Sequence, residues 1–312
     1  MQLRTLLFSS FMGICLAQRW KIDQSCGEYS SQRRVLKATM PLESAFTQAR
    51  DLATNAYSVL EEHYGADAHV QQMVKYILGD DTDLQEKVDT VKDAFRGVKT
   101  YEPAPFSWLD TFGSTNTDVL VYCDGSNFNT HTRDDGMVLH QNKAMGGALV
   151  SPGDWPMFDA CFNKDPAHSD KPIPMAITIS SDGEDKKAYD RAMAVWGATG
   201  AKGRRAGPRT VRETATELTE HHQSLQGLQN NNRAINKLSE TMGATFLHEL
   251  THTNQGGKLI DNLKDGDCYG WVCVTRLRDP MNSDSVNVLG VVLKVWSLGF
   301  FVDQDGRIQK KN

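Results

Sequence analysis

Two histidines and a glutamate stand close together near the C-terminal end of the chain, in the segment His248-Glu249-Leu250-Thr251-His252. Residues four apart lie on the same face of a helix, so the two imidazoles could bind one metal ion. The pattern H-E-x-x-H suits a tetrahedral Zn²⁺, with the glutamate as the general base that activates a metal-bound water. The sequence therefore predicts a catalytic zinc site with His248 and His252 as ligands and Glu249 as the base.

The third protein ligand of such a site is an aspartate, because no Glu follows Glu249 and no His follows His252. The aspartates after the motif are Asp261, Asp265, Asp267, Asp279, Asp284, Asp303 and Asp305. Asp279 precedes a proline at a turn, where Asp is common for local reasons. Asp303 and Asp305 resemble the start of a calcium-binding loop, but the glutamate that such a loop requires is missing. Asp261 comes nine residues after His252, so a short chain reversal would return it to the metal. We favour Asp261, with Asp265 and Asp267 as alternatives.

The motif lies in a predicted amphipathic helix. Apolar residues recur before and within it at spacings of three and four, at Ile235, Leu238, Met242, Phe246 and Leu250. The pair Gly256-Gly257 follows shortly after His252 and is expected to end this helix as its C-cap. A helix is the structural context that the metal-binding interpretation requires.

The composition is that of one or two globular domains. Of the 312 residues, 39% are hydrophobic and 23% are charged, which excludes disordered and collagen-like chains. The formal net charge of −5 provides no electrostatic basis for binding nucleic acid or anionic membranes. We therefore expect neither as a partner.

The first 17 residues are typical of a secretory signal peptide. Arg4 supplies the positive charge, the stretch from Thr5 to Leu16 is apolar but short for a membrane span, and small residues precede a cleavage site after Ala17. We expect a secreted, extracellular protein with no membrane segment after cleavage.

Export favours disulfides among the five cysteines that remain after cleavage: Cys26, Cys123, Cys161, Cys268 and Cys273. Cys268 and Cys273 are close in sequence and can pair if the backbone turns between them. A bridge between Cys123 and Cys161 is the second one expected, which leaves Cys26 without a disulfide partner.

The arrangement of predicted elements indicates an α+β fold that is mainly helical, with a small twisted β-sheet against the motif helix. Helical patterns cover Pro41 to Gly97, Lys187 to Trp196, Tyr269 to Arg278 and Ser283 to Leu298, and short strands are expected at Val119–Tyr122 and Ile173–Ile179. Residues 18–100 form an N-terminal helical region that is either a pro-segment or part of the domain. Residues 101–312 form the domain itself, with a polar insertion at about 197–233.

Over about residues 238–298, the chain resembles the aspzincins, the deuterolysin-like secreted zinc endopeptidases. The matching pieces are the motif at His248, Gly256-Gly257, Asp261, Tyr269-Gly270-Trp271 and Asn282-Ser283-Asp284-Ser285. The chain departs from the family pattern in two places. Asp261 lies eight residues before Tyr269, where the family has about three, and Val286 replaces an aromatic residue.

The resemblance implies a zincin-like metalloendopeptidase that cleaves protein or peptide substrates. His248, His252 and Asp261 would hold one catalytic Zn²⁺, Glu249 would be the base, and Tyr269 would donate a hydrogen bond to the oxyanion. Some members select lysine after the scissile bond with acidic side chains in the last matching segment, where Asp284 would be one such group. Asn287 stands where a second acid is expected, so no lysine specificity is predicted, and Asp284 could instead cap the helix that begins near Ser285. The alternative function is a non-catalytic secreted relative that acts as a binding or effector protein.

Overall fold

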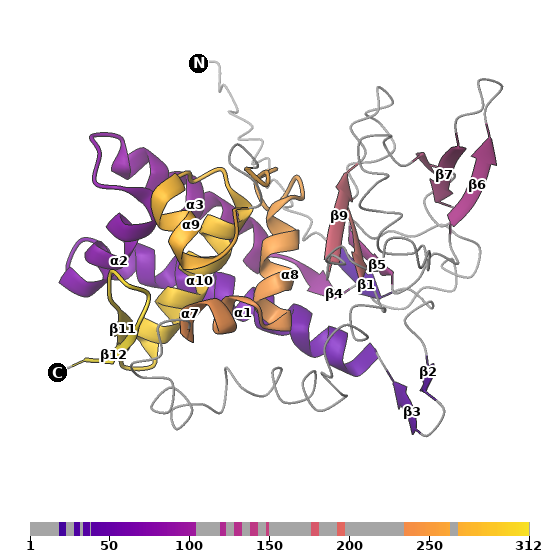
Figure 1. The fold of residues 1–312 in the computed structure, drawn as a ribbon, viewed down its shortest axis with the longest axis horizontal. Coiled ribbons are helices and arrows are strands. Elements are labelled where there is room, and N and C mark those ends of the chain that lie inside the picture. The colour runs from indigo at the N-terminus through magenta and orange to yellow at the C-terminus, as the bar shows by residue number, and fades with distance from the viewer. Residues whose placement is uncertain are drawn as a thin grey trace, which may run out of the picture.

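The structure is a computed structural model in which helices and a mixed sheet lie side by side (Figure 1). It describes residues 19–22, 28–31, 34–37, 39–103, 119–122, 128–132, 138–142, 148–149, 176–180, 192–196, 234–262 and 268–311. Within these residues the fold is mostly helical with small sheets, which confirms the α+β class.

The helical part carries the motif. Its elements are α1 (Thr39–Glu62), α2 (Ala68–Leu78), α3 (Leu84–Lys99), α7 (Ala234–Ser239), α8 (Met242–Thr251), α9 (Gly270–Leu277) and α10 (Ser283–Ser297), followed by a hairpin of β11 (Phe300–Val302) and β12 (Ile308–Lys310). Helix α8 packs against α1, α3 and α10 and lies beside strand β9. The motif helix is therefore enclosed by other elements of the fold.

The largest sheet has five strands in the order β4-β1-β5-β10-β9. These strands are β4 (Glu102–Pro103), β1 (Arg19–Ile22), β5 (Val119–Tyr122), β10 (Ala192–Trp196) and β9 (Ala176–Ser180). The first four run parallel, and β9 pairs antiparallel with β10 at the edge. The other described strands form a hairpin of β2 (Glu28–Ser31) and β3 (Arg34–Lys37) and a three-stranded sheet of β6 (Phe128–Thr132), β7 (Val138–Asn142) and β8 (Ala148–Leu149).

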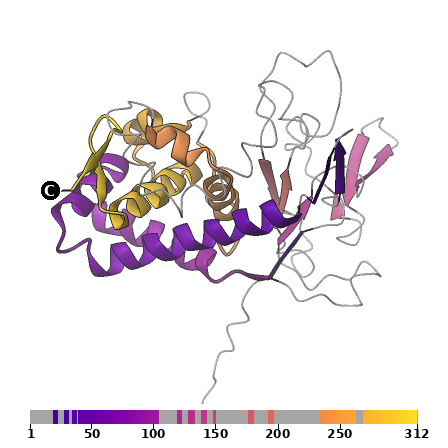
Figure 2. The same cartoon turned by 90° about the horizontal axis from the view of Figure 1, so that it is seen from below.

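Helix α1 joins the helices to the sheet. In Figure 2 this long violet helix runs along the helical part and reaches the strands. Its buried residues recur at helical spacing, among them Phe46, Ala49, Ala53 and Leu60. The ring of Phe46 stacks on the ring of Trp20 in β1, with ring centroids 4.0 Å apart. On α8, the centroid of the Phe246 ring lies 5.7 Å from that of Phe46. Through Phe46, one apolar core connects the sheet to the motif helix.

The helical pattern expected over Pro41 to Gly97 is confirmed as α1, α2 and α3, which share the core that encloses α8. The strand at Val119–Tyr122 is confirmed as β5. The strand expected at Ile173–Ile179 is confirmed from Ala176, since residues 173–175 lie outside the described residues. The two C-terminal helices are also confirmed, as α9 and α10.

The helix expected at Lys187–Trp196 is wrong where the structure describes it. Residues 192–196 form β10, which lies between β5 and β9 in the sheet. The run Ala-Met-Ala-Val-Trp is continuously apolar, as a strand enclosed between neighbours often is, and such a short run has no periodicity that separates strand from helix.

The single helix expected from Ile235 to His252 is divided in two. Helix α7 ends at Ser239, and Thr241 has an extended backbone and accepts a hydrogen bond from the N–H of Ala244, which makes it the N-cap of α8. The apolar spacing continues across this break, because Ile235 of α7 and Phe246 of α8 are both buried in the same core. Periodicity alone therefore could not reveal the break.

Several expectations fall on residues that the structure does not describe. These are the signal peptide at 1–17, the polar insertion at 197–233, and the cysteines Cys26, Cys123 and Cys161. Among the described residues, no helix combines the length and the apolar character that crossing a membrane requires.

The contact between α3 and the turn after α8 gives a stability prediction. A Cβ added at Gly97 would overlap the backbone carbonyl of Gln255, whereas a Cβ at Gly65 would meet nothing within 4 Å. Alanine normally favours a helix over glycine by about 1 kcal/mol. We expect Gly97→Ala to lower the free energy of unfolding by about 1–3 kcal/mol despite that gain, because the backbone must move.

Urea denaturation of the metal-free protein measures this change. Gly65→Ala is the matched control, and it should leave the free energy of unfolding within about 1 kcal/mol of the wild type. A Gly97→Ala protein as stable as the control would show that α3 does not pack on this turn as described.

Candidate metal centre

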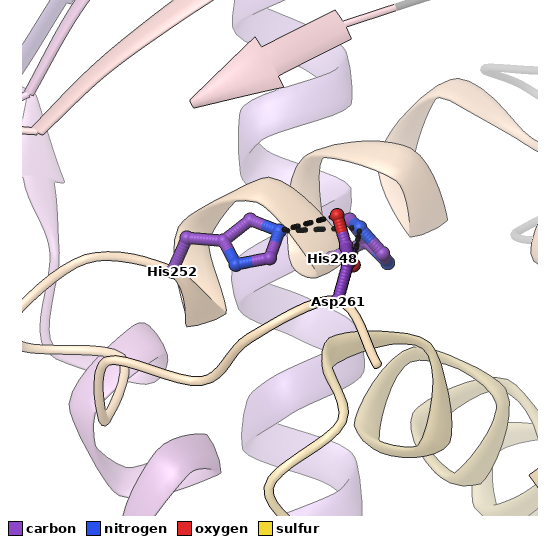
Figure 3. Close-up of side chains that lie close together, drawn as sticks. All are labelled: His248, His252 and Asp261. Carbon is purple, nitrogen blue, oxygen red and sulfur yellow. Dashed lines mark hydrogen bonds and ion pairs between the residues drawn. The ribbon is translucent and has the colours of Figure 1, made fainter. Parts of the chain in front are cut away.

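Three side chains converge at the C-terminal end of α8 (Figure 3). The Nε2 atoms of His248 and His252 lie 3.3 Å apart. The carboxylate of Asp261 lies across from both, with Oδ1 3.2 Å from Nε2 of His248 and Oδ2 3.6 Å from Nε2 of His252. One ligand atom from each residue falls within 4.8 Å of the others. Among the described residues, these three could hold a metal ion.

The turn after α8 returns the chain to the histidines. The helix ends at Thr251, and the segment turns back through Gly257 and Lys258, which both have positive φ angles. The N–H of Leu259 then donates to the carbonyl of Thr251 at 3.0 Å, and Ile260 forms a parallel bridge with Asn282. Asp261 follows directly, so its position is set by backbone hydrogen bonds on both sides of the turn.

The role expected for the Gly-Gly pair is wrong. His252 is the C-cap of α8, four residues before Gly256. A Cβ at Gly256 would instead overlap the carbonyl of Leu250, so glycine is needed for the close approach of the turn to the end of the helix. The pair permits the chain reversal rather than capping the helix.

Helix α3 and the residues after it hold this turn in place. The hydroxyl of Tyr101 donates to Oγ1 of Thr253 at 2.7 Å, and Nε2 of Gln255 donates to Oγ1 of Thr100 at 2.7 Å. Thr253 in turn donates to the carbonyl of Leu250 and accepts from the N–H of Gly256. The loop that carries Asp261 is thus attached to a buried part of the fold.

The hydrogen bonds of His252 determine which of its nitrogens is available. Its Nδ1 lies 2.8 Å from the carbonyl of Leu259 and 3.0 Å from the hydroxyl of Ser283. A carbonyl only accepts hydrogen bonds, so Nδ1 carries the proton and Nε2 keeps a lone pair. That lone pair is directed toward His248 and Asp261, as a metal ligand requires.

The charges around His248 favour a cation. Burial alone would lower the pKa of His248, but the carboxylates of Asp261 and Asp284 outweigh it, with a smaller contribution from Glu249, and raise the pKa to about 10. Burial would conversely raise the pKa of Asp261, but the neighbouring His248 outweighs it and lowers this pKa. In the metal-free protein, a proton on His248 supplies the positive charge that a metal ion would provide.

The unsatisfied groups at the site fit a metal ion. Oδ1 of Asp261 is buried and lacks a hydrogen-bond partner unless Nε2 of His248, 3.2 Å away, carries a proton. Leaving such an oxygen unpaired is unfavourable. A cation among the three ligand atoms would satisfy this oxygen and both Nε2 lone pairs together.

The remaining predicted residues lie close to this centre. Glu249 is 7% exposed and follows His248 on α8. Tyr269 precedes α9 and is 55% exposed, and its ring centroid lies 5.9 Å from that of His248. The structure therefore brings the ring of Tyr269 to the first histidine, and the carboxylate of Glu249 helps to raise the pKa of that histidine. Asp265 and Asp267 lie outside the described residues.

The expected disulfide between Cys268 and Cys273 is present, with Cα atoms 5.3 Å apart. It encloses Tyr269 and the first turn of α9, and so restricts the segment that carries Tyr269. Val286, at the position where the aspzincin pattern has an aromatic residue, is fully buried in α10.

The capping role considered for Asp284 is wrong. Helix α10 begins at Ser283 with Asn282 at the N-cap position, so Asp284 lies inside its first turn. Its Oδ1 lies 3.7 Å from Nδ1 of His248. Sequence reasoning also missed Ser283, which contacts His252. Ser283 and Asp284 directly follow Asn282 in the sequence, but no spacing rule links them to the histidines.

The geometry predicts which aspartate binds the metal. We expect Asp261→Ala to abolish stoichiometric zinc binding, because it removes one of three protein ligands and leaves two neutral imidazoles. Asp265→Ala and Asp267→Ala should bind zinc as the wild type does. Metal content after dialysis, measured by mass spectrometry, tests all three. Loss of zinc in either of the other variants, with Asp261→Ala unaffected, would contradict the assignment.

Comparisons with known proteins found no matching family model, curated protein or solved structure. The metal centre therefore rests on the sequence motif and on the convergence of His248, His252 and Asp261.

Proposed function

We propose that this protein is a secreted zinc-dependent metalloendopeptidase that hydrolyses peptide bonds of extracellular proteins. The observation that carries the proposal is the convergence of His248, His252 and Asp261 at one point, with Glu249 next to His248 in the sequence. A structural metal site has no need of a glutamate in this place, whereas hydrolysis needs a base close to the metal.

The ligand set and its spacing support zinc. Zinc binds histidine nitrogens at about 2.0–2.1 Å and carboxylate oxygens at about 2.0–2.2 Å, so tetrahedral ligands lie roughly 3.3–3.6 Å apart. The separations of 3.3, 3.2 and 3.6 Å among the three side chains are close to that range. Two imidazoles with one carboxylate are also the ligands of catalytic zinc sites that keep a fourth position open.

Each residue has a part in the proposed reaction. His248, His252 and Asp261 hold the zinc, which when bound makes water more acidic and polarises the substrate carbonyl. Glu249 accepts the proton of the attacking water and passes it to the leaving amine. Tyr269, exposed beside His248, donates a hydrogen bond to the oxygen on which negative charge develops.

The edge of the five-stranded sheet offers a place for the substrate backbone. Strand β9 pairs with β10 on one side, has no strand partner on its other side among the described residues, and lies next to α8. An extended peptide can add to such an edge through backbone hydrogen bonds. This recognition depends little on side chains and therefore suits an endopeptidase that acts on proteins.

A non-catalytic metal-binding protein is the second candidate function. The observation that favours it is Val286, which is buried where the aspzincin pattern has an aromatic ring. The two candidates share the metal centre and differ in the role of Glu249, so one substitution separates them.

We expect Glu249→Gln to lower the rate of casein cleavage by about 10²- to 10⁴-fold, because the amide cannot accept the proton. Zinc content should be unchanged, since Glu249 is not a ligand. Glu240→Gln is the control, because Glu240 is exposed and lies between α7 and α8. It should cleave casein as the wild type does.

Two outcomes would decide against catalysis. Equal cleavage by the wild type and Glu249→Gln would remove Glu249 from the mechanism and the peptidase proposal with it. A zinc-loaded wild type that cleaves no peptide bond would favour the binding protein.

A further inference from the structure

The first turn of α10 lies against the outer sides of both histidines. Ser283 and Asp284 are consecutive residues in this turn, and both are buried. The hydroxyl of Ser283 lies 3.0 Å from Nδ1 of His252, and Oδ1 of Asp284 lies 3.7 Å from Nδ1 of His248. These contacts are to Nδ1, while the Nε2 atoms face each other. The turn therefore lies behind the ligands rather than among them.

Asp284 is held in this position by neighbouring backbone and side-chain groups. Its Oδ2 accepts a hydrogen bond from the N–H of Gly270 at 2.6 Å, and its Oδ1 accepts one from Nδ2 of Asn287 at 3.3 Å. Asn287 also donates to the carbonyl of Ser239 at 3.2 Å. The carboxylate is thus connected to the start of α9 and the end of α7, and it is fixed independently of His248.

Two other roles for Asp284 do not fit its surroundings. It does not occupy the N-cap position of α10, which belongs to Asn282. It is 5% exposed, and each of its oxygens already accepts a hydrogen bond, so it is a poor partner for a basic side chain of a substrate. A buried carboxylate is costly unless it is hydrogen-bonded and paired, and His248 is the ion-pair partner that the structure gives it.

We propose that Asp284 is a positioning residue of the metal centre. Its charge favours the tautomer of His248 in which Nδ1 carries the proton, and so keeps the Nε2 lone pair directed at the metal. Histidine ligands of metals commonly have such an outer partner, which also makes the ligand nitrogen more basic. The carbonyl oxygen of Leu259 and the hydroxyl of Ser283 hold Nδ1 of His252 in the same way. The proposal rests on the zinc site of the proposed function but not on peptidase activity.

The test compares Asp284→Asn with Asp93→Asn. The first variant keeps the shape of the side chain and an oxygen for the N–H of Gly270, but removes the charge. Asp93 is exposed on α3 and pairs with Arg96, so its variant removes the same charge away from the site. Zinc affinity is measured by competition with a chromophoric chelator, and folding by circular dichroism of the metal-free proteins.

We expect Asp284→Asn to bind zinc about 10- to 100-fold more weakly than the wild type, with its folded state retained. Asp93→Asn should bind as the wild type does. Equal affinities in all three proteins would overturn the positioning role while leaving the peptidase proposal intact. A weakened Asp284→Asn in a protein without peptidase activity would support the positioning role and count against the proposed function alone.

A measurement on the wild type covers the case in which Asp284→Asn does not fold. In zinc-loaded protein labelled with ¹⁵N-histidine, nuclear magnetic resonance detects the Nδ1 proton of His248 and its exchange with water. Retention of this proton in slow exchange is expected, because a buried carboxylate lies opposite it. Exchange as fast as in free imidazole would overturn the proposal, as would a wild type that binds no zinc.

Discussion

The confinement of three ligand atoms at the end of α8 is the constraint on which the site depends. Two Nε2 atoms lie 3.3 Å apart beside a buried carboxylate oxygen without a hydrogen-bond partner. Lone pairs directed at one another repel unless a positive charge lies among them. In the metal-free protein a proton on His248 supplies that charge. The raised pKa of this histidine shows that the neighbouring carboxylates favour its protonated form. A metal ion supplies the same charge and satisfies all three residues together.

Much of the helical part serves to maintain this confinement. Helix α3 and Tyr101 hold the turn after α8, and this turn carries Asp261 back to the histidines. The first turn of α10 lies behind the histidines and contacts both of them. Preorganisation of this kind means that the free energy needed to bring the ligands together is spent when the chain folds rather than when the metal binds. The packing of the helices therefore contributes both to the stability of the fold and to the geometry of the candidate metal centre.

The sequence identified the three residues that converge, but not the groups that hold them in place. His248 and His252 could be predicted because helical spacing alone places them together, and Asp261 because a glycine turn precedes it. The break at Thr241 was missed because the apolar spacing continues across it, and β10 was missed because a short apolar run fits a helix equally well. Asp284 and Ser283 reach the histidines only through the packing of α10 against α8. No local pattern contains that contact.

The most direct test of the metal centre is the zinc X-ray absorption spectrum of the loaded wild-type protein. The geometry predicts about four nitrogen and oxygen ligands at roughly 2.0–2.2 Å, with the outer-shell scattering of two imidazole rings. No sulfur ligand is expected, because none of the three converging residues is a cysteine and the two described cysteines, Cys268 and Cys273, are joined to each other. A spectrum with a zinc–sulfur distance of about 2.3 Å, or without the scattering of two imidazoles, would contradict the assignment of His248, His252 and Asp261.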